Sequence, residues 1–180
     1  MKYLCITKKQ IMLFLSLTVA VVVVIVGSVG AYASANKLLP IYCVETDKKQ
    51  IAISFDAAWG NDDTQDLIDI LQKYNVPATF FVVGAWVDKY PESVKALHDA
   101  GHQIQNHSNT HPNMPQLSPE QMKNEIESCN QKIESVTGIT PTLFRPPYGD
   151  YDNTTIETLD ALKMYTIQWD VETLATKVIV

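Results

Sequence analysis

Residues 78–84 read Ala-Thr-Phe-Phe-Val-Val-Gly, an almost wholly apolar run that follows Pro77 and ends on a glycine. A strand that is apolar on both faces is typical of a parallel sheet covered by helices on both sides. The chain has 180 residues, of which 46 % are hydrophobic, and this length suits one domain with a short appendage. The run therefore predicts a domain built on a buried parallel sheet.

Further strands are predicted on both sides of this run. Residues 51–56 alternate, so that Ile51, Ile53 and Phe55 share one face. The other expected strands are residues 102–107, 143–145 and 164–170. Five short strands separated by helical patterns predict a parallel α/β fold.

Amphipathic helices are predicted between these strands. Asp62 and Asp63 can cap a helix with apolar positions at Leu67, Ile68, Leu71 and Tyr74. A capping box at residues 118–121 begins the longest helix, which Gly138 closes, and residues 107–117 are expected to form a loop. The other expected helices are residues 91–101, with Val94 and Leu97 facing inward, and one around residues 156–162.

The first 35 residues have the three parts of a secretory signal. Lysines precede an apolar run over residues 11–30, and Ala-Ser-Ala follows at residues 33–35. At about 20 residues, the run is also long enough to cross a bilayer uncleaved. We therefore expect residues 1–35 to be a signal peptide or an N-terminal membrane anchor, residues 36–49 a tether, and residues 50–180 a folded domain. The domain would be secreted or membrane-anchored outside the cytoplasm.

Composition narrows the choice of partners. The net charge is −6 and the sequence pI is about 5.1, with no cluster of Lys and Arg, which argues against a nucleic-acid partner. Cys43 and Cys129 are the only cysteines outside the leader. Cys129 lies on an apolar helix stripe, so we expect a buried free thiol rather than a disulfide.

Polar side chains stand where the predicted strands end. They are Asp56, His107, Arg145 and Asp170, one at the end of each of four strands. In barrels and in open parallel sheets, sites are built at the carboxyl edge of the strands. We therefore expect these four side chains to lie close together.

The four histidines of the chain all fall between His98 and His111. His107 and His111 are four residues apart and can face one ion, which outside the cell suits Zn²⁺ or a similar divalent ion. Asp56 can ligate that ion or act as a general base. His98 and His102 are expected to have no such role.

The stretch Arg145-Pro146-Pro147-Tyr148-Gly149 predicts a stiff loop, because two prolines fix its backbone and a glycine lets it turn. Such a loop can aim an arginine at a carboxylate and present a backbone N–H to a developing oxyanion.

Taken together, residues 54–56 (Ser-Phe-Asp), the His107–Ser108–x–x–His111 pattern and residues 145–149 resemble the first three motifs of the polysaccharide deacetylases. This family shares the NodB homology domain and forms carbohydrate esterase family four. The resemblance covers residues 48–174 and is strongest to cell-wall and sporulation-type deacetylases of Gram-positive bacteria. It implies an α/β fold of the distorted (β/α) barrel type.

The resemblance also implies an activity and a set of roles. The activity is hydrolysis of N-acetyl groups from an acetylated cell-wall glycan that contains N-acetylglucosamine or N-acetylmuramic acid. Asp56 matches the general base, His107 and His111 the metal ligands, and Arg145 the residue that orients the base. Tyr148 matches the residue whose backbone N–H faces the oxyanion. The implied ion is Zn²⁺, with Co²⁺ as an alternative.

Three departures from the family pattern stand out. In the family pattern, the position of Ala57 holds an aspartate that serves as the third metal ligand. In this chain water, Asp62 or Asp63 would have to take its place. Residues 172–176 lack the second Asp and the Trp of the fourth motif, and the fifth motif would lie beyond Val180. We therefore expect a barrel that is incomplete at its C-terminal end. The chain is then a weak enzyme, a glycan-binding pseudoenzyme or an inactive fragment.

Overall fold

The computed structural model describes residues 7–35 and 37–172 of the chain. The chain divides into two units, Met1–Lys37 and Leu38–Val180. The first unit contains one helix, α1 (Lys8–Ala35). Large apolar side chains between Ile11 and Val26 are exposed along α1, and the interpretation of residues 1–35 as a signal peptide or membrane anchor stays a prediction. Within the described residues, no helix combines the length and the apolar character needed to cross a membrane.

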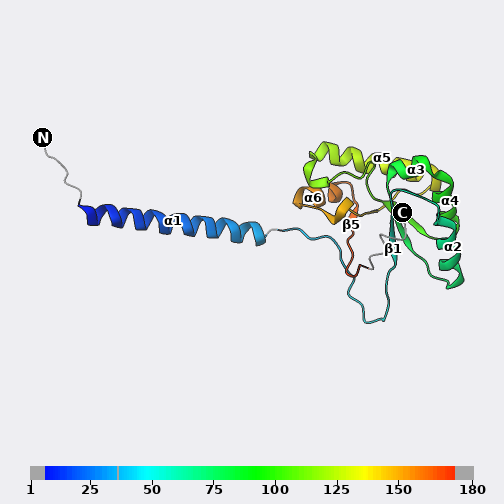
Figure 1. The fold of residues 1–180 in the computed structure, drawn as a ribbon, viewed down its shortest axis with the longest axis horizontal. Helices are drawn as coiled ribbons and strands as arrows, with labels where there is room; N and C mark the ends of the chain where they lie inside the picture. Colours follow the sequence, from blue (N-terminus) through cyan, green and yellow to red (C-terminus); the bar gives the residue numbers. More distant parts are fainter. Residues whose placement is uncertain (1–6, 36, 173–180) are drawn as a thin grey trace. The chain divides into compact units, whose positions relative to one another are not determined.

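The second unit is built on a five-stranded parallel sheet, as predicted (Figure 1). The strands lie in chain order, which is β1 (Ser54–Ala57), β2 (Thr79–Val82), β3 (Gln103–Asn106), β4 (Leu143–Phe144) and β5 (Tyr165–Thr166). Among the described strands β1 and β5 stand at the two ends of this order, and the sheet does not close between them.

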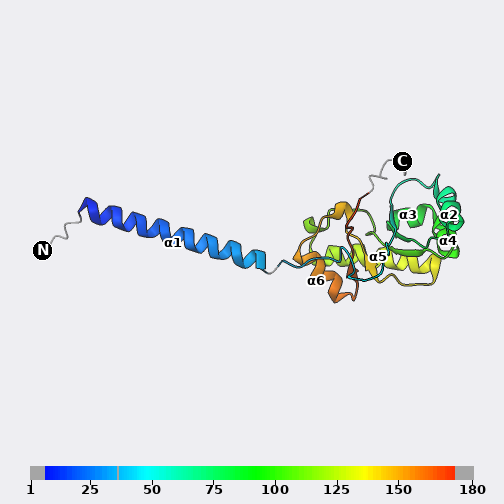
Figure 2. The ribbon, with the colours of Figure 1, turned by 90° about the horizontal axis from the view of Figure 1, so that it is seen from below.

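Helices connect the strands. They are α2 (Thr64–Lys73), α3 (Gly84–Lys89), α4 (Pro91–Asp99), α5 (Pro119–Thr137) and α6 (Asn153–Ala161), with short 3₁₀ helices at Met114–Gln116 and Pro147–Gly149. Figures 1 and 2 show α2, α3 and α4 gathered at one end of this unit, with α6 toward the other end. The helix α5 begins with the predicted capping box at Ser118 and Gln121, and it ends at Gly138 in the left-handed conformation.

Two apolar clusters form the core. The larger lies among β1, β2, β3 and α2 to α5, and it includes Val82, Trp86 and Ile133. The smaller includes Met122, Ile126 and Phe144 and lies beside β4 and α6. The helix α5 contributes to both clusters, because Met122 and Ile126 belong to one and Cys129 and Ile133 to the other.

Several elements differ from the sequence-based expectation. The first strand begins at Ser54 rather than at residue 51, and Ile51 is exposed. Asp63 is the residue before α2, but its side chain makes no capping hydrogen bond. The helix α3 was not predicted, because its six residues are too few to display a helical period.

The segment after α1 also departs from a simple tether. Ile41 forms a parallel bridge with Ile167, and its backbone N–H donates to the Thr166 carbonyl at 2.8 Å. The Gln168 N–H donates in turn to the Ile41 carbonyl at 2.8 Å. Residues around Ile41 therefore extend the sheet beyond β5, a pairing that depends on a partner more than 100 residues away along the chain and has no local signal.

Candidate functional site

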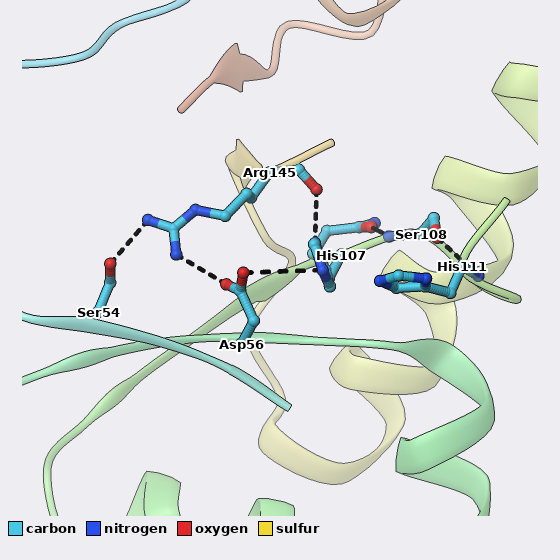
Figure 3. A network of polar contacts seen from close by, with 7 residues as sticks. Ser54, Asp56, His107, Ser108, His111 and Arg145 are labelled. Atoms are coloured by element: carbon cyan, nitrogen blue, oxygen red, sulfur yellow. Dashed lines mark hydrogen bonds and ion pairs between the residues drawn. The ribbon is translucent and has the colours of Figure 1, made fainter. Parts of the chain in front are cut away.

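The register of the sheet brings the ends of its strands side by side. Asp56 pairs with Phe81 on β2, and Val82 pairs with Asn106 on β3. Asp56, near the end of β1, and His107, just after β3, therefore lie at the same edge of the sheet. Asn106 pairs with Phe144, which places Arg145 at the same edge. Figure 3 shows Asp56, His107, His111 and Arg145 gathered there. The expected convergence is therefore present for these residues.

Arg145 holds the Asp56 carboxylate in one orientation. Its Nη1 donates to Asp56 Oδ1 at 2.7 Å, and its Nη2 donates to Ser54 Oγ at 2.7 Å (Figure 3). The guanidinium also lies over the Phe81 ring at 4.1 Å from its centroid, and Arg145 is buried. Because Asp56, Ser54 and Phe81 all contact the Arg145 guanidinium, its position is fixed, and it holds the Asp56 carboxylate in place. Asp56 Oδ2 then faces His107, whose Nε2 is 3.8 Å away.

His107 is held in one tautomer. Its Nδ1 lies 2.7 Å from the Arg145 carbonyl oxygen, and since a carbonyl can only accept, Nδ1 carries the proton. The lone pair is therefore on Nε2, which faces Asp56. Burial lowers the pKa of His107, so its neutral form is favoured, although the nearby Asp56 carboxylate opposes this shift.

His111 completes the cluster from a tight turn. Its ring meets that of His107 edge to face, with the centroids 5.0 Å apart. Its backbone adopts φ 62°, and its N–H donates to Ser108 Oγ at 3.0 Å. Burial lowers the pKa of His111 as well. Two neutral imidazoles therefore stand together beside a carboxylate.

The cluster supplies part of the set of ligands that a divalent ion needs. Neutral imidazoles are the ligating form, and a backbone carbonyl that fixes Nδ1–H is the usual support for an Nε2 ligand. Within the residues that the structure describes, no group of three or more His, Cys, Asp or Glu side chains is close enough to hold an ion. Ala57 packs in the larger apolar cluster, whereas Asp63 lines a small pocket together with Asp56. Asp62 is exposed.

Tyr148 lies next to His111. Its ring contacts the imidazole edge-on at 4.7 Å between centroids, and the residue is 70 % exposed. Its backbone is left-handed, with φ 60° and ψ 5°. Gln168 Nε2 donates to the Gly149 carbonyl at 2.7 Å and so secures the loop that carries Tyr148.

The remaining predicted residues take other places. Asp170 is exposed and lies beyond the end of β5 at Thr166, because that strand is shorter than expected. His98 lies on α4 and is partly buried. His102 is buried just before β3, where its Nδ1 accepts the Ala78 N–H at 3.3 Å. Cys129 is buried and Cys43 exposed, and both thiols are free, as expected.

Sequence reasoning assigned no role to Ser54, Glu125 or Gln168, which support the cluster through hydrogen bonds. Ser54 is part of the first motif, two residues before Asp56 on an alternating strand, so strand periodicity placed it on the same face. Glu125 and Gln168 reach the site from distant parts of the chain, and no local pattern indicates their contacts.

Parallel α/β proteins commonly carry their functional site at the carboxyl ends of the strands, and Asp56, His107, His111 and Arg145 lie at that edge here. The family model of the polysaccharide deacetylases matches residues 44–167. The chain therefore belongs to the polysaccharide deacetylase family.

Three similar proteins illustrate the range of this family. The peptidoglycan-N-acetylmuramic acid deacetylase PdaA of Bacillus subtilis is 34% identical over 131 residues, which are 72% of this chain and 50% of PdaA. The peptidoglycan-N-acetylglucosamine deacetylase of Bacillus cereus is 30% identical over 84% of this chain and 55% of its own length. The crystal structure of BA3943, described as a CE4 family pseudoenzyme from Bacillus anthracis, is 35% identical with a TM-score of 0.74 and covers 77% of this chain and 50% of BA3943. The chain thus spans about half the length of these relatives.

Proposed function

We propose that this protein hydrolyses N-acetyl groups of a cell-wall glycan outside the cytoplasm, with the help of a divalent metal ion, Zn²⁺ or Co²⁺, bound by His107 and His111. The observation that carries the proposal is the position of Asp56. One carboxylate oxygen is held at 2.7 Å by Arg145, and the other faces His107 Nε2 at 3.8 Å. A base fixed beside two neutral imidazoles supports metal-assisted hydrolysis, because it supplies two ligands and a proton acceptor.

Each residue has a defined task in this proposal. A bound ion would polarise the acetamide carbonyl and lower the pKa of water. Asp56 accepts the proton of the attacking water, and this proton passes to the departing amine as the C–N bond breaks, so that acetate and the free amine leave. The Arg145 guanidinium keeps the carboxylate aimed at that water. The backbone N–H of Tyr148 is proposed to donate to the oxygen on which negative charge develops. Water, Asp62 or Asp63 is proposed to supply the third ligand in place of Ala57.

The proposed substrate is peptidoglycan or a related polymer. The relatives named for a peptidoglycan substrate act on N-acetylglucosamine in one case and on N-acetylmuramic acid in the other. Both sugars carry the same acetamide, so the proposed chemistry is common to them.

The experiment is acetate release from N-acetylglucosamine oligomers and from purified peptidoglycan, with and without added Zn²⁺ or Co²⁺. We expect release that depends on the metal and is lost in Asp56→Asn, which keeps the shape of the side chain but removes the base. Asp88→Asn is the matched control, because Asp88 is paired with Lys132 on the surface. Release that persists in Asp56→Asn at the parental rate would overturn the proposal.

A second candidate function is glycan binding without hydrolysis. Two observations favour it, namely Ala57 at the position of the family's aspartate ligand and the similarity to the pseudoenzyme BA3943. Binding of acetylated oligomers, measured by calorimetry, with no acetate released in the presence of either metal would support this alternative over the enzyme.

A further inference from the structure

Glu125 makes an unusual set of contacts with the turn that precedes His111. It lies on α5 and is partly buried. Its Oε2 accepts the backbone N–H of Asn109 at 2.9 Å and that of Thr110 at 2.8 Å. Its Oε1 accepts the Thr110 hydroxyl at 2.8 Å. One carboxylate therefore binds three donors of two consecutive residues.

The opposite side of the turn is held by the start of α3. The Gly84 N–H donates to the Ser108 carbonyl, and the Ala85 N–H donates to the Asn109 carbonyl, both at 2.9 Å. A Cβ at position 84 would lie 2.4 Å from Asn109 Oδ1 and 3.1 Å from Asn109 Cα, so a larger residue would force the Asn109 side chain to move. The turn is thus fixed between α3 on one side and the Glu125 carboxylate on the other.

The backbone of the turn needs such support. Ser108 has φ 68° and His111 has φ 62°, a left-handed conformation that residues other than glycine adopt rarely. Such conformations persist when the surrounding contacts determine them. The position of the His111 ring depends on this backbone, because the backbone sets the direction of the Cα–Cβ bond that carries the imidazole.

We propose that Glu125 is a positioning residue that sets the place of the His111 imidazole relative to His107, and thereby the metal affinity of the pair. The inference rests on the proposed metal site. Both oxygens of Glu125 are engaged by the turn, so Glu125 acts through the backbone of residues 109–110 and does not ligate the ion. A carboxylate suits this task, because charge-assisted bonds to N–H donors are stronger than neutral ones.

The test is the affinity of the purified metal-free chain for Co²⁺ and Zn²⁺, measured by calorimetry, with the visible spectrum of the Co²⁺ form as a report on its ligand geometry. We compare Glu125→Ala with Glu125→Gln, because the glutamine amide can still accept the two N–H groups and donate to the Thr110 hydroxyl. Glu127→Ala is the control, since Glu127 lies on the same helix and pairs only loosely with Lys123, at 3.9 Å. Circular dichroism at the same temperature checks that each variant is folded.

We expect Glu125→Ala to weaken metal binding by about 10- to 100-fold, the usual effect of removing support behind a ligand, and to change the Co²⁺ spectrum. Glu125→Gln should bind within about threefold of the parent, and Glu127→Ala should equal it. A folded Glu125→Ala with parental affinity and spectrum, alongside a His107→Ala that no longer binds, would refute the positioning role and leave the metal site intact. A parent chain that binds neither ion would overturn the metal proposal, and the role of Glu125 with it.

Discussion

At the level of single residues, the site depends on how a few side chains restrict one another. Arg145 contributes its guanidinium to Asp56 and its carbonyl to His107, so a single residue orients both the proposed base and one proposed ligand. The guanidinium also stacks on Phe81, which limits its rotation. A change at Arg145 therefore acts on the geometry of the site more than on its net charge.

Arg145→Lys tests this view. Lysine keeps the charge but cannot bond Asp56 and Ser54 at once as a planar fork does. We expect acetate release to fall by roughly 100-fold, because a misplaced base loses the advantage of orientation. Metal affinity, measured by calorimetry, should change far less, since the carbonyl that fixes His107 belongs to the backbone. A variant as active as the parent would show that the charge alone suffices.

His107→Ala tests the proposed ligands. We expect it to abolish stoichiometric Zn²⁺ binding, whereas His98→Ala, on α4, should bind like the parent. Burial lowers the pKa of both His107 and His111 from the ordinary histidine value, so protons compete with the ion only in acidic solution. Affinity should therefore stay level near neutral pH and fall below about pH 6. Equal binding by both variants would place the site elsewhere.

At the level of helices and strands, the sequence predicted what is encoded locally. The apolar run at residues 78–84 became β2, and the capping box at Ser118 began α5, because these patterns act over a few residues. The short α3, the bridge of Ile41 to Ile167 and the contacts of Glu125 were not foreseen. The six residues of α3 are too few to show a helical period, whereas the bridge and the contacts of Glu125 depend on partners elsewhere in the chain. The ends of strands depend on pairing with neighbouring strands, as the position of Asp170 beyond β5 illustrates.

His102, just before β3, is hydrogen-bonded to Ala78, just before β2. We expect this contact to make the stability of the fold depend on pH. Its Nδ1 accepts the Ala78 N–H at 3.3 Å, so the neutral ring carries its proton on Nε2. Burial lowers the pKa of His102, and charging the ring would place a second donor against that N–H. The unfolded chain then takes up a proton near pH 6.5 before the folded chain does, so stability falls as the pH drops from about 6.5 through the lower folded pKa.

The measurement is the free energy of unfolding of the metal-free chain in urea between pH 7.5 and pH 4.5. One histidine can contribute a slope of at most about 1.4 kcal/mol per pH unit. We expect His102→Asn to reduce the slope of the parent below pH 6.5, because the asparagine oxygen can still accept the Ala78 N–H but does not titrate. An unchanged slope would mean that His102 is not a source of acid sensitivity.

At the level of the whole folded unit, α5 joins what would otherwise be two separate cores. Ile133 and Cys129 pack in the larger cluster with β1 to β3, and Ile126 and Met122 pack in the smaller one beside β4 and α6. The buried Asn106 side chain adds a bond to the Ile126 carbonyl at 2.8 Å and another to Asn130 at 2.7 Å. A rigid helix shared by both clusters couples their stability.

We therefore expect residues 38–172 to unfold in one cooperative step, in spite of the open edge of the sheet at β1. Ile126→Ala and Ile133→Ala each remove a fully buried side chain, one from each cluster, and should each cost about 2–5 kcal/mol. Both variants should shift the same transition, whether it is followed by far-ultraviolet or near-ultraviolet circular dichroism. Lys123→Ala, on the exposed face of α5, should change the stability by less than about 0.5 kcal/mol. If Ile133→Ala moved only one of two separate transitions, the two clusters would be independent, and α5 would not couple them.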